Sequence, residues 1–322
     1  MLFLSEQNMK QSVTMKDIID AIDETYHIYE SQIHQMPERM QVKDHDNTLL
    51  LMPCLTDDAM ATKLVTVFPN NQEHPTLNGL VVLNSQETGE VKSVLNGTFL
   101  TGMRTGAVGG SAVRHLSDES ASSLAVIGTG TQGFYQAIAA CTERPIKDIY
   151  LHNRSKDKLE SFKKSLMDWM GEDINVHIAP TPEEAINDAD IVITATTSHD
   201  PVFPDSPHML ENKLFIGIGS FQPGMREFPQ SLYTIADALF VDTEHAIVES
   251  GDMAVPLEKG WITKDSIMTM SRHIEKKTQI NSDNNPGTTV FKSTGMALFD
   301  VVVANLIYKK ALENNTGTKL SM

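Results

Sequence analysis

The stretch SSLAVIGTGTQGFYQAIAACTE, residues 122–143, decides the fold of this chain. Its apolar residues 124–127 predict a buried strand, and residues 132–142 predict a helix. Between them Gly128, Gly130 and Gly133 form the pattern GxGxxG. In dinucleotide-binding folds these glycines make a tight turn, admit a pyrophosphate and let the helix pack on the strand, while the helix N-terminus offers free N–H groups. The position between a strand and a helix favours a phosphate-binding turn over a glycine-rich turn without a ligand.

The end of the second expected strand, residues 149–152, indicates which coenzyme the turn serves. NAD-binding folds usually place an acidic residue there to hold the ribose hydroxyls. This chain has Asn153, Arg154 and Ser155 instead, with Lys158 nearby. A guanidinium pairs well with a 2′-phosphate, and Ser155 can donate a hydrogen bond. The pattern therefore favours NADP(H), with NAD(H) as the second option. An exposed loop arginine without a ligand is the alternative interpretation of Arg154.

Short apolar runs alternate with helical stretches through the middle of the chain. Expected strands are residues 124–127, 149–152, 176–179, 191–194, 214–218 and 239–241, and expected helices between them are 132–142, 156–170 and 182–187. This alternation predicts an α/β domain with a doubly wound parallel sheet covered on both faces. We place this Rossmann domain at residues 120–293, with an expected loop at 281–288.

The first third of the chain has a different pattern. Residues 15–31 have the apolar spacing of a helix. Residues 47–53, 61–68, 78–84 and 90–95 are strand-like, and the last two are predicted to form a hairpin. Residues 99–115 are rich in glycine and alanine, which predicts a helix that packs closely against a neighbour. A final amphipathic helix is expected at residues 294–313, beyond the last strand of the central sheet.

Composition and charge exclude several classes of partner. The 322 residues carry 26 Lys and Arg against 42 Asp and Glu, a net charge of −16, which disfavours nucleic acid and anionic membrane surfaces. The sequence has no apolar run of membrane-spanning length and no signal-peptide pattern at its start. Two cysteines, Cys54 and Cys141, are too few for a disulfide framework, so we expect a cytoplasmic protein. No histidine or cysteine cluster has metal-ligand spacing, and no metal is expected.

Three basic residues of the first third are candidates for binding an anion. Lys63 shares a strand face with Ala61, Val65 and Val67, where an unused ammonium group is costly. Arg104 lies in a segment otherwise poor in charge, and Arg39 lies between the first helix and the first strand. Together they are suited to hold a carboxylate, and a desolvated lysine is suited to donate a proton. Taken singly, each also fits a surface or ion-pair residue.

The chain resembles the ornithine cyclodeaminase/mu-crystallin family over nearly its whole length. The resembling segments are PERM, LLLMP, KLVTVFPNN, HPTLNG, RTGA, VIGTGTQG, HNRS, GSFQPGMRE and KSTGMALFD. The resemblance implies a Rossmann domain at 120–293 inserted into an α+β substrate and dimerisation domain, residues 1–119 with 294–322. It also implies a homodimer and a small amino-acid or imino-acid substrate handled with NAD(P)(H).

The resemblance assigns substrate roles to the three cations. Arg39, Lys63 and Arg104 match the positions that hold the substrate carboxylate, and Lys63 and Arg104 are the expected catalytic residues. Thr76 matches a position near the nicotinamide.

The resemblance also assigns the coenzyme site. Gly130, Thr131 and Gln132 match the pyrophosphate loop, which Gly128 and Gly133 complete. The turn at residues 153–155 is similar to the NADPH-binding turn of mu-crystallin.

Two departures from the family pattern bear on the reaction. Cyclodeaminases carry a glutamate where this chain has Leu50 and a catalytic aspartate where it has Phe221. A phenyl ring neither moves protons nor binds an ammonium group by charge. We therefore expect an oxidoreductase acting on the C=N or CH–NH bond of a small imino or amino acid, such as a pyrroline- or piperideine-2-carboxylate reductase or an amino-acid dehydrogenase. The alternatives are an ornithine cyclodeaminase with recycled NAD and a mu-crystallin-like protein that binds NADPH without turnover.

Overall fold

The computed structural model describes residues 1–171, 173–276 and 287–321, and the chain divides into two compact units. Unit 1 is Met1–Arg104 with Met296–Met322, and unit 2 is Thr105–Gly295. The loop expected at 281–288 falls mostly outside the described residues. Within the described part, no helix is long and apolar enough to cross a bilayer.

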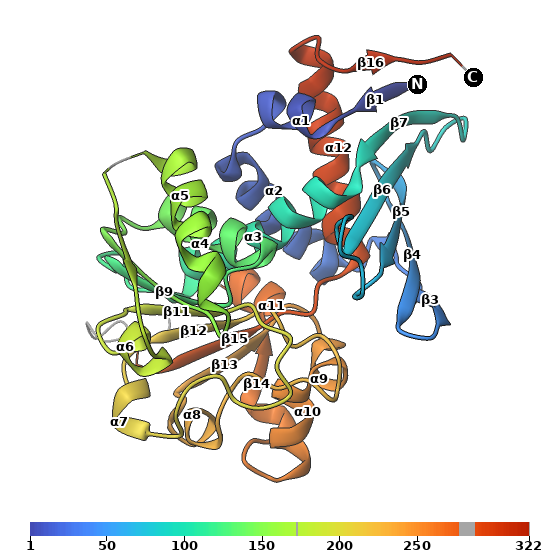
Figure 1. The fold of residues 1–322 in the computed structure, drawn as a ribbon. Coiled ribbons are helices and arrows are strands. Elements are labelled where there is room, and N and C mark those ends of the chain that lie inside the picture. Colours follow the sequence, from blue (N-terminus) through green and yellow to red (C-terminus); the bar gives the residue numbers. More distant parts are fainter. Residues whose placement is uncertain (172, 277–286, 322) are drawn as a thin grey trace. The chain divides into compact units, whose positions relative to one another are not determined.

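Unit 2 is built, within its described residues, on an eight-stranded parallel sheet (Figure 1). Its spatial order is β10-β9-β8-β11-β12-β15-β13-β14. The bounds are β8 Ser123–Ile127, β9 Asp148–His152, β10 Asn175–Ile178, β11 Ile191–Thr194, β12 Leu214–Gly217, β13 Ala238–Val241, β14 Ile267–Thr269 and β15 Thr289–Lys292. The predicted parallel α/β sheet is confirmed.

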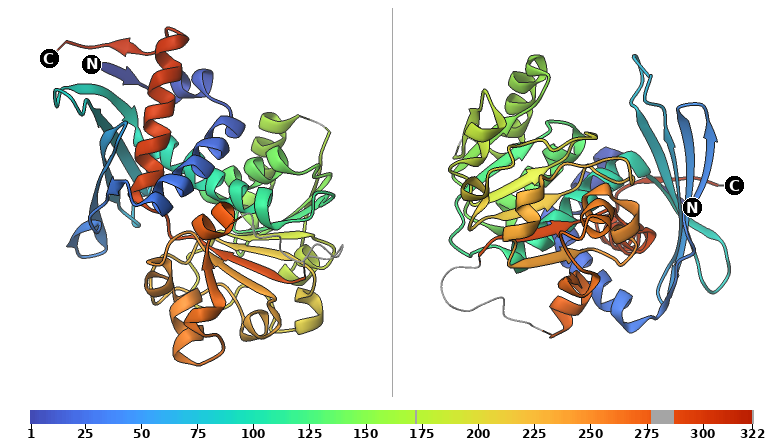
Figure 2. Two further views of the ribbon diagram at one scale, coloured as in Figure 1. Left: turned by 180° about the vertical axis from the view of Figure 1, so that it is seen from behind. Right: turned by 90° about the horizontal axis from the view of Figure 1, so that it is seen from below.

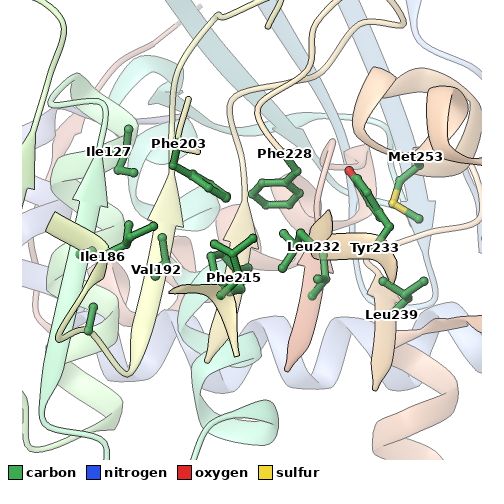
Figure 3. Close-up of a cluster of buried hydrophobic side chains, with 14 of the residues drawn as sticks. Ile127, Ile186, Val192, Phe203, Phe215, Phe228, Leu232, Tyr233, Leu239 and Met253 are labelled. Atoms are coloured by element: carbon green, nitrogen blue, oxygen red, sulfur yellow. The ribbon is translucent and has the colours of Figure 1, made fainter. Parts of the chain in front are cut away.

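The central strands β8, β11, β12, β13 and β15 are short and almost wholly buried on both faces, as is typical of a parallel sheet covered by helices, whereas β9, β10 and β14 are only partly buried. Helix α3, Gly97–Leu116, begins in unit 1 and continues into unit 2. The other helices and 3₁₀ turns of unit 2 are α4 Thr131–Glu143, η1 Lys156–Lys158, α5 Leu159–Met170, α6 Pro182–Ile186, α7 Pro207–Leu210, α8 Gln230–Ile235, α9 Ala246–Glu249, α10 Gly251–Glu258, η2 Lys264–Ser266 and α11 Met270–Lys276. Figure 3 shows one layer of the core, in which Phe203, Phe215 and Phe228 pack with Leu232 of α8. Each large apolar side chain buried in this way contributes about 1.5–3 kcal/mol.

Sequence reasoning missed β15, which pairs with β12 on one side and β13 on the other. Its four residues, TVFK, are all buried, but they follow directly on the polar, glycine- and proline-containing segment NSDNNPGT. A four-residue run is too short to show a periodicity. Its last residue, Lys292, is a fully buried lysine.

Unit 1 contains an eight-stranded sheet among its described residues, in the order β16-β1-β7-β6-β5-β4-β2, with β3 paired to β4. The bounds are β1 Leu2–Leu4, β2 His34–Gln35, β3 Met40–Asp44, β4 Asn47–Thr56, β5 Met60–Val67, β6 Leu77–Asn84, β7 Val91–Asn96 and β16 Thr318–Lys319, with helices α1 Glu6–Ser12, α2 Met15–Ser31 and α12 Ala297–Glu313. Strands β4 to β7 form an antiparallel meander in which side chains alternate between the two faces.

One face of this sheet is covered by α12, which lies along α2 (Figure 2). Helix α2 spans the predicted residues and begins at a capping box formed by Thr14 and Asp17. Its residues Ile18, Ile22 and Tyr26 are fully buried, and Tyr26 meets Phe299 of α12 edge-to-face. The chain ends thus form one core with the meander.

The small residues of α3 serve packing within unit 2. A Cβ on Gly106 would lie 2.6 Å from the carbonyl oxygen of Tyr135 in α4, and one on Gly109 would overlap the side chain of Gln136. Gln136 Nε2 donates to the carbonyl oxygen of Thr105 at 2.7 Å. Glycine is therefore required at position 106, where α3 and α4 approach each other at backbone distance, whereas at position 109 the space is taken by the Gln136 side chain.

Candidate functional site

A pocket of about 480 Å³ lies at the carboxyl ends of β8, β9 and β11 in unit 2. Strand β8 lies between β9 and β11, so the chain winds away in opposite directions on its two sides. Open α/β sheets bind ligands at such a switch point. The lining residues are Ile127–Gly130, His152–Ser155, Ala195–Ser198, Pro201 and Val202.

The three glycines of the turn differ in what requires them. Gly128 has φ +103°, and a Cβ there would lie 2.6 Å from the carbonyl oxygen of Ala195. A Cβ on Gly133 would overlap the carbonyl oxygen of Gly128. A Cβ on Gly130, by contrast, meets no protein atom within 4 Å, and its φ of −95° suits any residue. Protein packing therefore explains Gly128 and Gly133, whereas Gly130 leaves open space in the pocket for a ligand.

The turn leads into α4, whose N-terminal residues Thr131 and Gln132 follow the cap at Gly130. The cap makes no side-chain hydrogen bond to the helix. The first N–H groups of a helix have no intrahelical acceptor and carry a partial positive charge. Among the described residues, Thr129 Oγ1 and Gln132 Oε1 are buried without a hydrogen-bond partner. The free N–H groups of the helix and the Thr129 hydroxyl can donate hydrogen bonds to the phosphates of a dinucleotide.

The turn after β9 forms another wall of the pocket. Asn153 Oδ1 accepts a hydrogen bond from the N–H of Thr129 at 3.4 Å, and its Nδ2 donates to the carbonyl oxygen of Ser155 at 2.9 Å. Asn153 therefore ties this turn to the glycine turn. Arg154 and Ser155 are exposed, and the lining includes no acidic residue.

A second cluster of charged residues lies within unit 1, where Asp300 of α12 meets two cations. Lys63 Nζ is 2.6 Å from Asp300 Oδ2, and Arg104 Nε is 2.9 Å from Asp300 Oδ1. All three side chains are less than 10% exposed. Two buried cations on one carboxylate leave a net positive charge, which is the electrostatic requirement for binding an anion.

The environment of Lys63 changes its acidity. The pKa of Lys63 is lowered to about 8, mainly by burial. The charges of Arg104 and Arg39 also lower this pKa, and the Asp300 carboxylate opposes the shift. The lysine lies on the buried face of β5 between Ala61 and Val65, as the alternation predicted. A lysine with this pKa exchanges its proton near neutral pH.

The other two predicted residues of unit 1 have different surroundings. Arg39 is half-buried just before β3, and its charge acts on Lys63, so three predicted cations share one region of unit 1. Thr76 is exposed just before β6, and its carbonyl oxygen accepts from the N–H of Phe68 at 2.7 Å. Among the described residues, no hydrogen bond joins Thr76 to Lys63, Arg104 or Asp300.

Sequence reasoning missed Asp300 as a site residue. Its position carries a signal, because it shares a helix face with Ala297, Ala304 and Ile307, and an acid on an apolar face requires a partner. Cys54 lies on the same buried sheet face as Lys63. Burial and the Asp300 carboxylate raise the pKa of Cys54 to about 12, so this thiol is not a nucleophile at neutral pH.

The two positions that depart from cyclodeaminases carry no acid in their place. Leu50 is a half-buried residue of β4, opposite Val65. Phe221 is 42% exposed in the loop after β12. Their side chains offer no proton carrier.

Comparison with known proteins matches this chain along its length. The model of the ornithine cyclodeaminase/mu-crystallin family matches residues 1–315. A Δ1-pyrroline-2-carboxylate reductase of Bacillus thuringiensis subsp. konkukian is 33% identical over 99% of both chains. The structure of Thermococcus litoralis Δ1-pyrroline-2-carboxylate reductase in complex with NADH and L-proline superposes with a TM-score of 0.91 at 28% identity, covering 99% of this chain and 100% of that one. An archaeal alanine dehydrogenase dimer with bound NAD gives 0.88 at 27% identity, covering 99% and 98%.

Proposed function

This chain belongs to the ornithine cyclodeaminase/mu-crystallin family, and from that membership and its two sites we propose that it is a nicotinamide-dependent reductase of a C=N bond next to a carboxylate. Its substrate class is a small imino acid, and its product is the corresponding amino acid. A cyclic ketimine such as Δ1-pyrroline-2-carboxylate fits best, because two relatives similar over nearly the whole chain bear that activity in their names. The observation that carries the proposal is the buried Lys63–Asp300–Arg104 cluster.

The substrate carboxylate is held by Arg104 and Arg39. Arg104 uses Nε on Asp300, and a guanidinium carries four further N–H donors in a planar fork that suits a carboxylate. Asp300 holds the guanidinium and the ammonium group in place while leaving the cluster net positive. Fixing the carboxylate fixes the adjacent imino carbon, and such positioning removes much of the entropic part of the barrier.

Lys63 supplies the proton for the imino nitrogen. Its pKa of about 8 leaves most of it protonated at neutral pH yet able to release the proton. When bound, the reduced nicotinamide supplies the hydride for the imino carbon, so that C=N becomes CH–NH. The protonated lysine also stabilises negative charge that develops next to the carboxylate. Thr76 is proposed to contact the nicotinamide.

The coenzyme is held in unit 2 by the turn from Gly128 to Gly133. We assign its phosphates to the N-terminus of α4 and its adenosine ribose to the turn at Asn153–Ser155. Arg154 has no acidic neighbour in the pocket lining, and its guanidinium suits a 2′-phosphate, so the proposal is that NADP(H) is preferred. NAD(H) is the second option, and the two solved relatives above carry NADH and NAD.

The proposed assembly is a homodimer formed through unit 1. The sheet face opposite to α12 carries the cross-strand row Met40, Leu51, Leu64 and Leu80. Met40 is 58% exposed and Leu80 37% exposed, while the other two are half-buried. A continuous apolar row on a sheet face is typical of a protein interface. The alanine dehydrogenase relative is a dimer.

Product analysis separates the reductase from its alternatives. With Δ1-pyrroline-2-carboxylate, the reductase consumes one NADPH for each L-proline formed. A cyclodeaminase instead forms proline and ammonia from ornithine without net change in NADPH, and the absence of an acid at Leu50 and Phe221 weighs against it.

Substitution of Lys63 separates an enzyme from a binding protein. Lys63→Ala removes the proton donor and is expected to abolish turnover while NADPH still binds. A protein that binds NADPH without turnover shows no reduction before or after the substitution. NADPH oxidation at 340 nm with a panel of imino and keto acids is the measurement, and no turnover of any of them would end the proposal.

A further inference from the structure

The buried carboxylate of Glu227 lies behind the coenzyme pocket and is not used by the mechanism above. Glu227 is fully buried, and its carboxylate accepts four hydrogen bonds. Thr196 donates to Oε1 from its N–H at 2.7 Å and from Oγ1 at 2.8 Å. Gly219 and Ser220 donate to Oε2 from their N–H groups at 2.9 and 3.1 Å.

These four donors come from two loops at the carboxyl edge of the sheet. Thr196 belongs to the loop after β11 that lines the pocket, and Gly219 and Ser220 belong to the loop after β12. The two loops touch at backbone distance, because a Cβ on Gly219 would overlap the backbone of Thr196. Glu227 therefore connects the pocket-lining loop after β11 to the loop after β12, although its own side chain does not line the pocket.

Two further buried charged residues, Lys292 and Asp252, fix the position of Glu227. Lys292 Nζ lies 3.9 Å from Glu227 Oε2 and 3.2 Å from Asp252 Oδ2. Asp252 Oδ1 accepts from the N–H groups of Glu227 and Phe228 at 2.7 and 3.0 Å. The pKa of Glu227 is raised, chiefly by burial and also by Asp252, against the opposing effects of Lys292 and the N–H and O–H donors of Thr196. Four hydrogen bonds thus reach the two carboxylate oxygens, and three of them come from backbone N–H groups.

From this geometry we propose that Glu227 is a positioning residue for the coenzyme. Its carboxylate, beside Lys292 and with its backbone fixed by Asp252, holds Thr196 in place in the pocket wall. The inference rests on the proposed function, since it concerns the coenzyme of that same pocket. The effect passes through Thr196, because Glu227 does not line the pocket.

The experiment is a comparison of Glu227→Gln with the matched control Glu143→Gln. Glutamine has the same shape but turns an N–H donor toward two of the four donors. Glu143 is a nearly buried glutamate of the same unit that pairs with Arg114 at 2.8 Å, and it lies at the end of α4 away from the glycine turn. Its loss removes an ion pair without touching the pocket wall.

The affinities for NADPH and NADH are measured by coenzyme fluorescence. Thermal midpoints, KM and kcat are measured on the same 322-residue chain. We expect Glu227→Gln to weaken coenzyme binding at least tenfold and to raise the coenzyme KM more than it lowers kcat. Glu143→Gln is expected to lower the thermal midpoint with coenzyme affinity unchanged. If Glu227→Gln binds the coenzyme as tightly as the unmodified protein does, the inference is overturned.

A double-mutant cycle with Thr196→Val tests the route of the effect. If Glu227 acts through Thr196, the double variant loses no more affinity than Glu227→Gln alone, whereas fully additive losses would overturn the inference. Should Glu227→Gln fail to fold, Thr196→Val alone decides: weaker coenzyme binding supports the inference and unchanged binding overturns it. Absence of coenzyme binding by the unmodified protein would instead overturn the proposed function.

Discussion

Replacing Asp300 by asparagine should move the pH dependence of the reaction, because the Asp300 carboxylate raises the pKa of Lys63 against the effect of burial. Its Oδ2 lies 2.6 Å from Lys63 Nζ, and its Oδ1 lies 2.9 Å from Arg104 Nε. Removing an opposite charge at such a distance changes a pKa by about 1–3. We expect the pKa of Lys63, about 8 in the unmodified protein, to fall to near 6 when the drop is about 2.

The expected loss of activity follows from the fraction of Lys63 that is protonated, since the proposed mechanism uses its proton. At pH 7.5 the protonated fraction drops from about three quarters to about 3%, which predicts a loss of about 25-fold in kcat/KM. In the proposed mechanism the imino nitrogen takes its proton from Lys63, so activity is expected to fall as pH rises through the pKa of Lys63. The alkaline limb of the profile therefore lies near pH 8 in the unmodified protein and near pH 6 in Asp300→Asn.

The assay is kcat/KM for the reduction of Δ1-pyrroline-2-carboxylate, measured from pH 5.5 to about 9.5 at saturating NADPH. Asp17→Asn is the matched control, because it removes the 2.6 Å ion pair between Asp17 of α2 and Lys310 of α12 far along the helix from Asp300. That control should keep the profile of the unmodified protein. Breaking a buried pair costs about 3–5 kcal/mol, so folding is checked by the thermal midpoint. A folded Asp300→Asn variant whose alkaline limb has not moved would refute the reasoning.

The remaining predictions concern the coenzyme and the assembly. Gly130→Val is expected to weaken NADPH binding at least tenfold while changing stability by less than about 1 kcal/mol, whereas Gly133→Ala should destabilise unit 2 by about 1–3 kcal/mol, both checked by coenzyme fluorescence and urea unfolding. Arg154→Ala should raise the dissociation constant of NADPH about 10- to 100-fold and leave that of NADH nearly unchanged; equal losses for both would contradict the 2′-phosphate assignment. Leu64→Glu places a charge in the apolar row of unit 1, and sedimentation is expected to show a dimer for the unmodified chain and a monomer for the variant.

Local patterns predicted the parts of this protein whose signal lies within a few residues. The helix at Met15–Ser31 follows from the spacing of Ile18, Ile22 and Tyr26, and the glycine turn follows from its place between β8 and α4. The burial of Lys63 follows from the alternation of β5. In each case the period of the backbone is enough to place the side chain.

The rest depends on contacts between residues distant in the chain. Arg104 and Asp300 are separated by 196 residues, and the apolar periodicity of their two helices does not predict that their side chains meet. The same holds for Glu227 and Thr196, 31 residues apart, where two loops at one sheet edge share a carboxylate. Strand β15 escaped notice because four buried residues carry no repeat, although it places Lys292 beside Asp252. Pairings of this kind are determined by topology, which the sequence pattern left open.

Hydride transfer to the imino carbon is tested most directly by isotope labelling. The protein is incubated with Δ1-pyrroline-2-carboxylate and NADPH that carries deuterium at C4 on the transferred face, and the product is examined by mass spectrometry and NMR. The account predicts L-proline with one deuterium at its α-carbon for each NADPH oxidised. Proline without deuterium, or coenzyme left unoxidised in the presence of the imine, would contradict it.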